Sequence, residues 1–156
     1  MIMPRHYVLD ANALIAYFAE VLLSSQNCRE TTDISPEAKQ TIEQALVSET
    51  TDVRPTVPSV ALVEVYKNCL TDEELVREFY YEVFVRLAQS PNVEIRALDR
   101  EVLENLVTIG DNLLRHELHD KLIVATARIL KATLITTDSA IQRYAKNPQS
   151  GLRALP

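Results

Sequence analysis

Four carboxylates occupy positions at which they could do chemistry: Asp10, Glu64, Asp120 and Asp138. Two follow short apolar runs and precede helical stretches, one begins an apolar stretch, and Glu64 is the only charged group within residues 60–65. Carboxylates held close together repel one another, which raises some of their pKa values. A hard divalent cation relieves this repulsion, because Mg²⁺ and Mn²⁺ prefer oxygen ligands and keep bound waters that hydrolysis can use. Together the four acids predict a Mg²⁺ or Mn²⁺ site.

Each acid also has an ordinary structural explanation. Asp10 and Asp138 could serve as N-caps of the helices that follow them. Asp120 could be an acid that the helix dipole favours near a helix start. Glu64 could lie on the solvent-facing stripe of an amphipathic helix. For each residue alone both explanations stay open, and only the combination favours a site.

The elements that would position these acids alternate between short apolar runs and stretches with helical spacing. Strands are predicted at 6–9, 53–57, 93–97, 133–136 and 152–155, and a loop at 24–35. Helices are predicted at 11–23, 36–49, from 58 onward, and at 71–90, 99–118, 119–131 and 138–146. This alternation predicts one α/β domain over residues 1–156, a three-layer α/β/α fold with a mostly parallel central sheet. Asp10 and Asp138 fall at the carboxyl ends of predicted strands, where ligands bind in such sheets.

Local signals mark several helix starts. Ser35 and Pro36 fit an N-cap followed by proline at the first helical position. Thr71 and Glu74 have the spacing of a capping box. Asp99 is predicted to cap the helix that follows it.

The composition limits the classes of function. The chain has 156 residues, a formal charge of −6 and a pI near 5.1, which argues against a protein that mainly grips nucleic acid by charge. Acids gathered at a metal site contribute to this balance. Cys28 and Cys69 belong to no CxxC pair, so we predict free thiols in a reducing compartment. The start of the chain lacks a signal-peptide pattern, and polar residues interrupt the apolar region 7–23, so we expect no membrane span and a cytoplasmic location.

Four stretches resemble, in order, the motifs of the PIN domain family: YVLDANALI at 7–15, PSVALVE at 58–64, DKLIVATA at 120–127 and LITTD at 134–138. The resemblance implies a compact α/β/α fold and Mg²⁺- or Mn²⁺-dependent ribonuclease activity on RNA. It assigns the family's acidic positions to the four carboxylates above. Its two polar positions fall on Asn12 and Thr136, which would orient ligands or contact substrate. Many small members resemble VapC-like toxins, which implies an antitoxin partner.

The chain departs from the family pattern in three ways. Lys121 follows the third acid, where a small residue is common, and its ammonium would weaken metal binding or contact a phosphate. The span 20–58 is longer and more polar than in a minimal member. The acidic balance opposes contact with RNA. Lys67, Lys121 and Arg143 are the predicted phosphate contacts.

The remaining chemistry-bearing side chains are assigned structural roles. His6, His116 and His119 show no convincing metal-ligand spacing. The tyrosines at 66, 80 and 81 could stack on bases, but helical spacing favours the core or an interface. We expect a homodimer. The apolar helices around residue 66 and from 75 to 87 would suit a dimer or antitoxin surface, and core packing explains them equally well.

Two other functions stay open. A phosphatase of the haloacid dehalogenase type also begins with an apolar strand and an aspartate. That chemistry uses a second aspartate two residues later, where this chain has Asn12, and Gly110-Asp111 is a poor match for its later acidic motif. The same fold could instead be a non-catalytic binding module that kept its acids for structure. Hydrolysis of a phosphomonoester would indicate the first function, and absence of metal binding the second.

Overall fold

A parallel sheet forms the centre of the molecule. The computed structural model describes residues 3–22, 33–110, 113 and 116–156, without the side chains at 20 and 21. Its strands lie in the order β3-β2-β1-β4-β5, and every neighbouring pair is parallel. The strands are β1 (Arg5–Leu9), β2 (Val53–Pro58), β3 (Glu94–Arg96), β4 (Thr133–Ile135) and β5 (Arg153–Leu155). The predicted parallel sheet is thus confirmed.

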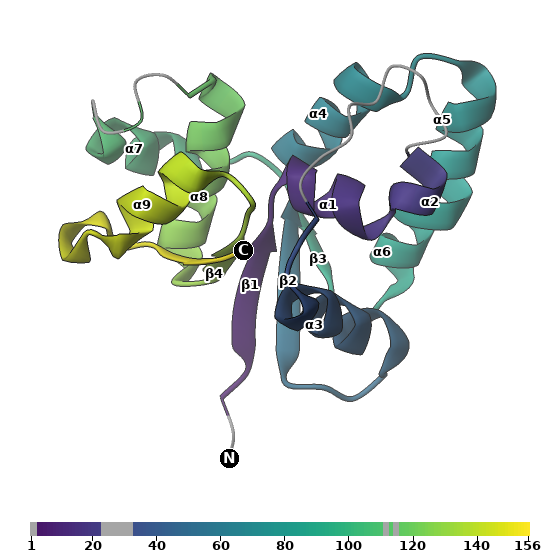
Figure 1. The fold of residues 1–156 in the computed structure, drawn as a ribbon, viewed down its shortest axis with the longest axis horizontal. Helices are drawn as coiled ribbons and strands as arrows, with labels where there is room; N and C mark the ends of the chain where they lie inside the picture. The colour runs from purple at the N-terminus through teal and green to yellow at the C-terminus, as the bar shows by residue number, and fades with distance from the viewer. Residues whose placement is uncertain (1–2, 23–32, 111–112, 114–115) are drawn as a thin grey trace.

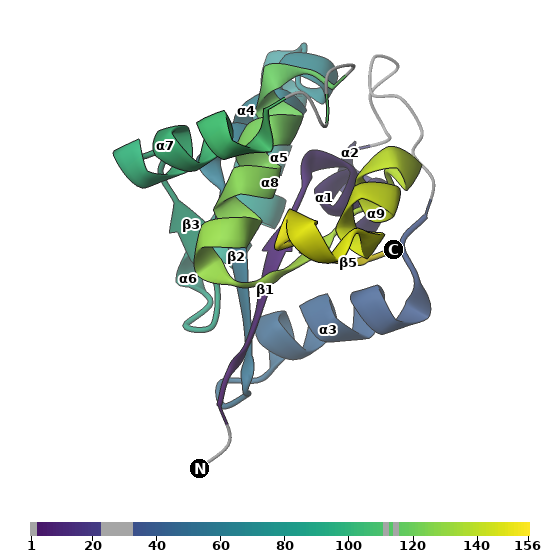
Figure 2. The same cartoon turned by 90° about the vertical axis from the view of Figure 1, so that its left-hand side faces the viewer.

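Helices cover both faces of this sheet. They are α1 (Ala11–Tyr17), α2 (Ala19–Leu22), α3 (Pro36–Val47), α4 (Ser59–Cys69), α5 (Glu73–Phe79), α6 (Val85–Gln89), α7 (Arg100–Ile109), α8 (Leu118–Leu130) and α9 (Ser139–Lys146). In Figure 1, α7, α8 and α9 lie on the left and α1, α2, α4, α5 and α6 on the right; Figure 2 shows the first group in front. A right-handed crossover puts its helices on one face of a parallel sheet when the next strand is added on one side, and on the other face when the strand is added on the opposite side. Here β2 and β3 lie on one side of β1, and β4 and β5 lie on the other. The predicted three-layer α/β/α fold is confirmed.

The strand order creates a switch point beside β1. β1 pairs with β2 on one side and with β4 on the other, and β4 in turn pairs with β5. Tyr7, Val8 and Leu9 of β1 are buried, as expected for a strand covered on both faces. The carboxyl ends of β1 and β4 therefore lie side by side, with Leu9 opposite Ile135. A ligand site is expected at this point of an open α/β sheet.

The predicted helix over 99–118 is too long. Asp99 caps α7 as predicted, accepting a hydrogen bond from the Val102 N–H at 3.0 Å, but the helix ends at Ile109. Gly110 follows with a φ of 56°, a conformation that favours glycine and ends a helix. The glycine was the signal that sequence reasoning placed inside the helix.

The helix predicted at 71–90 is correct in extent but differs in its start and middle. Its N-cap is Asp72, whose side chain accepts from Leu75 N–H at 2.7 Å, rather than Thr71. A π-helical segment, η1 (Tyr80–Phe84), joins α5 to α6. The buried positions 75, 79, 83 and 87 recur every fourth residue, and each such step turns an α-helix about 40° too far. A wider π turn brings these side chains back onto one buried face.

The predicted free thiols are corrected at Cys69, which is buried and disulfide-bonded. Cys28 lies outside the described residues. Much of the predicted loop at 24–35 also lies outside them. None of the described helices is both long and apolar enough to cross a membrane.

Candidate functional site

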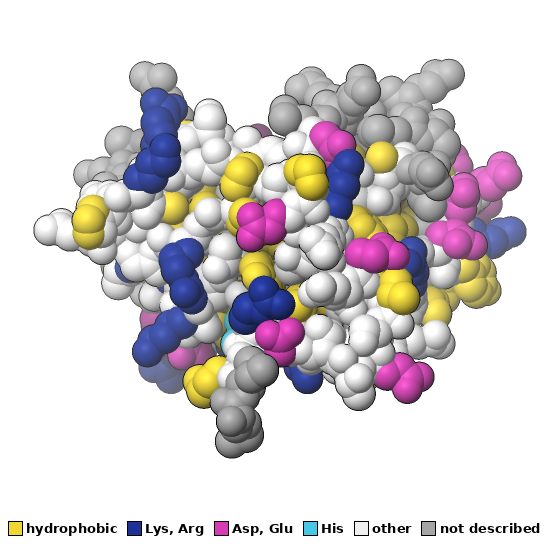
Figure 3. Space-filling view, turned by 60° about the horizontal axis from the view of Figure 1, so that its bottom comes forward, with side chains coloured by type: hydrophobic (Ala, Val, Ile, Leu, Met, Phe, Trp, Pro, Cys, Tyr) yellow, Lys and Arg dark blue, Asp and Glu magenta, His cyan; other side chains and the backbone are white. Residues whose placement is uncertain are grey.

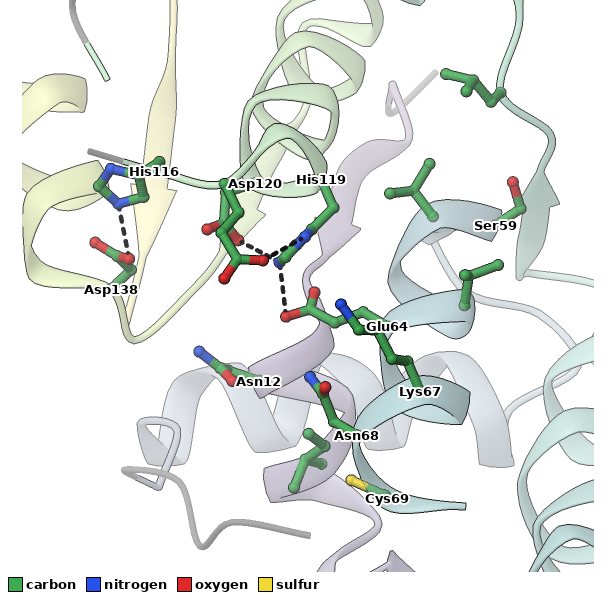
Figure 4. A pocket seen from close by; sticks show the side chains of 15 residues that line it. Asn12, Ser59, Glu64, Lys67, Asn68, Cys69, His116, His119, Asp120 and Asp138 are labelled. Atoms are coloured by element: carbon green, nitrogen blue, oxygen red, sulfur yellow. Dashed lines mark hydrogen bonds and ion pairs between the residues drawn. The ribbon is translucent and has the colours of Figure 1, made fainter. Parts of the chain in front are cut away.

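A cavity of about 970 Å³ lies between α4 and α8, beside the carboxyl ends of β1 and β4 (Figure 4). Its lining is rich in groups that bind cations or carry protons. Three predicted acids lie in its wall: Glu64, Asp120 and Asp138. The other titratable side chains lining it are Lys67, His116, Glu117 and His119.

Glu64, His119 and Asp120 form the centre of this wall. His119 and Asp120 occupy the first turn of α8, and Glu64 faces them from α4 (Figure 4). His119 Nε2 lies 2.9 Å from Glu64 Oε1 and 3.5 Å from Asp120 Oδ1. Each residue offers one ligand atom, and the three atoms lie within 4.8 Å of one another. Among the described residues, this is a group of oxygen and nitrogen donors that could hold a metal ion.

Asp138 combines a structural contact with a place in the cavity. Its Oδ1 accepts hydrogen bonds from the N–H groups of Ala140 and Ile141, at 2.9 and 3.0 Å, so it is the N-cap of α9. Its Oδ2 lies 2.9 Å from His116 Nε2. The capping role weighed from the sequence is therefore real, and it fixes the carboxylate at the end of β4 while its second oxygen meets the histidine.

Asp10 is buried and does not line the cavity. Its Oδ1 accepts from Ala13 N–H at 2.7 Å, which makes it the N-cap of α1. Burial raises the pKa of Asp10 to about 7, and the charges of Glu64 and Asp120 act in the same direction. The Thr136 hydroxyl and the Ala13 N–H stabilise the carboxylate and partly lower this pKa. The charges of the cavity wall therefore help to raise the pKa of Asp10, although the Asp10 side chain is buried.

Burial and mutual repulsion also act on the two central acids. Burial raises the pKa of Glu64, and Asp120 and Glu117 add to this, while His119 opposes it. Burial raises the pKa of Asp120 as well, with Asp138 and Glu117 adding and His119 and His116 opposing. These shifts mark a set of carboxylates that needs positive charge nearby. A divalent cation fits this need, and the donors suit it chemically.

Only one of the three polar residues predicted to assist the acids lines the cavity. Asn12 lines the cavity beside Asp138 and Glu64. Thr136 is fully buried; its hydroxyl accepts from Asp138 N–H at 3.1 Å and donates to Asp10, so it links two of the acids. Lys121 is half-buried in α8 and does not line the cavity.

Of the predicted phosphate contacts, Lys67 lines the cavity and is exposed. Arg143 lies exposed in the last turn of α9, outside the lining.

Two histidines in the cavity wall were missed by sequence reasoning. His116 and His119 had been assigned structural or surface roles, yet each contacts a predicted site acid at 2.9 Å. His6 lies on the exposed start of β1. A signal was available, because His119 adjoins Asp120 and His116 stands one helical turn before it. The spacing of the histidines from one another matches no metal-ligand motif, so only their nearness to Asp120 indicates the site.

No family sequence model and no curated protein sequence matches this chain. Solved structures that include the following share its fold over nearly the whole of both chains. A VapBC2 structure from Rickettsia felis, bound to a DNA fragment of its promoter, matches with a TM-score of 0.62 at 15% identity, covering 97% of this chain and 99% of that one. A DNA-bound VapBC structure from Salmonella typhimurium gives 0.58 at 13% identity, with 98% and 97% covered.

A toxin–antitoxin complex from Klebsiella pneumoniae gives a TM-score of 0.55 at 21% identity, with 94% of each chain covered. At such low identities the likeness establishes the fold. That fold, the switch point between β1 and β4, and the motif order seen in the sequence agree with one another. The chain therefore has the PIN-like fold that its four motifs predicted.

Proposed function

We propose that this chain is a metal-dependent ribonuclease and the toxin of a toxin–antitoxin pair. The observation that carries the proposal is the meeting of Glu64, Asp120 and Asp138 in one cavity wall, with Asp10 buried close enough to feel their charge. These acids come from positions that are far apart in sequence. Their pKa shifts indicate a site that is relieved by a cation, which a purely structural set of surface acids would not need.

In this proposal Asp10, Glu64, Asp120 and Asp138 hold one or two Mg²⁺ or Mn²⁺ ions. A bound ion would lower the pKa of a water ligand and offset charge on the phosphate. Glu64 or Asp120 would help to accept the proton of the attacking water, because both carboxylates line the cavity in which that water would lie. Asn12 would orient a ligand or contact the substrate from the cavity wall.

Phosphate contact is assigned to Lys67, because it is the predicted contact that lines the cavity. The face shown in Figure 3, toward the start of β1, carries basic and acidic side chains interspersed with apolar ones. Such a mixed surface gives an RNA strand no continuous basic track. RNA binding is proposed at the cavity, where a bound cation would reverse the local charge.

The antitoxin is proposed from the fold comparison, since the matching structures are VapBC and toxin–antitoxin complexes. An RNA-cleaving toxin of this kind would act in the cytoplasm, where its substrates lie. Exposed Tyr66, Tyr80 and Tyr81 of α4 and η1 leave an aromatic surface for the antitoxin or for a second copy. The buried Leu75 and Leu87 belong to the core instead.

The test is cleavage of single-stranded and structured RNA in Mg²⁺, in Mn²⁺ and in EDTA. Asp10→Asn keeps a side-chain oxygen that can cap α1 but removes the charge. We expect it to lower cleavage by about 100-fold or more. Asp99→Asn is the matched control, because Asp99 also caps a helix and does not line the cavity. Full activity in Asp10→Asn, or cleavage in EDTA, would show that the site is wrongly assigned.

A binding module without catalysis is the second candidate. The capping bonds of Asp10 and Asp138 favour it, because they give both acids a structural purpose. Titration calorimetry with Mn²⁺ separates the two functions, since a module whose acids are structural would release or absorb no heat of binding. A phosphatase is the weaker candidate, and a chromogenic phosphomonoester assay tests it.

A further inference from the structure

We infer that His119 is a metal ligand held in place by Glu117, and that the site consequently prefers Mn²⁺ to Mg²⁺. This inference rests on the proposed metal site and goes beyond it, because it names a nitrogen ligand, a positioning residue and the preferred ion. The carboxylates alone would make an all-oxygen site, which gives no reason to prefer a transition metal.

The two nitrogens of His119 face different partners. Nδ1 lies 3.3 Å from Glu117 Oε2, at the N-cap position of α8. Nε2 points toward Glu64 and Asp120 in the cavity wall (Figure 4). In this structure Nε2 hydrogen-bonds to Glu64; a bound ion would take the place of that proton, and Glu117 accepting from Nδ1–H would leave the lone pair of the neutral imidazole on Nε2. Metal-binding histidines are held by carboxylates in this way, which fixes the ring and strengthens the ligand.

The spacing of the donors fits one ion. His119 Nε2 lies 2.9 Å from Glu64 Oε1 and 3.5 Å from Asp120 Oδ1. Neighbouring ligands of an octahedral ion with bonds of about 2.1 Å stand about 3 Å apart. Small side-chain adjustments would therefore let all three atoms contact the same ion, with positions left for water. His119 is also only part-exposed, at 26% of its side chain, so its orientation is constrained.

The donor set decides between the two ions. Mg²⁺ favours oxygen ligands and gives up its waters reluctantly. Imidazole nitrogen is a ligand of first-row transition metals, and affinity for such a site rises from Mn²⁺ onward along that series. One nitrogen among oxygen donors thus favours Mn²⁺ over Mg²⁺ while leaving a water-rich ion suited to hydrolysis. His116 differs, because its Nε2 is directed at Asp138, which lies outside this group of three.

The experiment is pulsed electron paramagnetic resonance of Mn²⁺ bound to the purified full chain. Electron spin echo envelope modulation should show coupling to a histidine nitrogen in the wild type. Labelling histidine alone with the heavy nitrogen isotope should change that coupling, which identifies the ligand type without any substitution. His119→Gln should remove the coupling, and the matched variant His116→Gln should keep it. Absence of Mn²⁺ binding, or bound Mn²⁺ without nitrogen coupling, overturns the inference.

Calorimetry supplies the second measurement. Mn²⁺ should bind the wild type more tightly than Mg²⁺, and competition between the ions should give the same ratio of affinities. Glu117→Gln should weaken Mn²⁺ binding about 10-fold or more through loss of the carboxylate that orients His119. His119→Gln should bring the two affinities together, and an unchanged ratio would contradict the assignment. Mn²⁺ bound through nitrogen without RNA cleavage would refute the proposed function alone, and cleavage with an all-oxygen ion would refute this inference alone.

Discussion

Asp10 connects the chemistry of the site to the stability of the fold. Its carboxyl group is buried beneath a wall of other acids, so burial and repulsion both oppose its ionisation. The same group caps α1 and receives the Thr136 hydroxyl, so it cannot turn away to solvent. A residue placed this way should make the metal-free protein sensitive to pH.

We predict that the metal-free protein loses stability as pH rises from about 4 to about 7. The folded pKa of Asp10 is about 7, whereas the ordinary value is 3.8. Between these values the unfolded chain has already released the proton that the folded chain retains, so the free energy of unfolding falls with pH. The loss should be on the order of a few kcal/mol across this window. Urea unfolding in EDTA at several pH values measures it.

The control for this prediction is the comparison with Asp10→Asn. The variant keeps the histidines and the other acids, so the difference in slope between the two proteins isolates Asp10. Asp99→Asn should retain the wild-type slope, since the capping N–H of Val102 and the charge of Arg96 lower the pKa of Asp99 and place its effect at more acidic pH. Parallel curves for wild type and Asp10→Asn would show that Asp10 ionises normally.

Thr136 is expected to matter through its hydroxyl. That group accepts from Asp138 N–H and donates to Asp10 in a fully buried position. Thr136→Val should therefore destabilise the protein by about 1–3 kcal/mol, because both partners lose a buried hydrogen bond. Thr136→Ser retains the hydroxyl and should recover most of this energy. Chemical denaturation of the three proteins measures it, and wild-type stability in Thr136→Val would show that the hydroxyl does not stabilise the fold.

At the scale of elements, the prediction is most accurate where the apolar periodicity of a segment agrees with the capping or breaking residues at its ends. The strands around β1, β2 and β4 are short apolar runs that end at polar residues or proline, and their positions are confirmed. Ser35 caps α3 with Pro36 after it, as its signal indicated. The end of α7 was missed because the apolar spacing continues past Gly110, and only the glycine marks the stop. The π-helical turn was not predicted because it depends on how apolar side chains at every fourth position pack against the core.

The backbone conformation of Gly110, at the end of α7, leads to a prediction about stability. Its φ of 56° and ψ of −131° lie where residues with a side chain are strained. A Cβ at this position would contact nothing within 4 Å, so the cost comes from the backbone alone. Gly110→Ala should destabilise the protein by about 1–3 kcal/mol in thermal or urea unfolding. Gly151→Asn is the comparison, because Gly151 is left-handed and asparagine tolerates that conformation; a smaller loss at Gly110 than at Gly151 would contradict this explanation.

At the scale of the molecule, the site exists only when distant elements are assembled. The order of the four acids along the chain could be read from the sequence, and so could their places at strand and helix ends. Their separations could not, because these depend on how α4 and α8 pack across the sheet. The pairing of His119 with Glu64 is of this kind: it joins residues 55 positions apart through packing alone. The sequence shows that His119 adjoins Asp120, but no local pattern places His119 against Glu64.

This assembly predicts that metal binding stabilises the whole fold. An ion held by Glu64 of α4 and Asp120 of α8 binds the folded chain and not the unfolded one. At a Mn²⁺ concentration of 100 times the Kd, the gain is about 2.7 kcal/mol, which raises the Tm of a domain this size by about 5–10 °C. Calorimetric melting with Mn²⁺ and with EDTA measures it. Asp120→Asn should lose most of the rise and Asp99→Asn should keep it. An equal rise of the Tm in Asp120→Asn would show that the ion binds elsewhere. A cation bound to other surface carboxylates would stabilise the protein without needing the packing of α4 against α8.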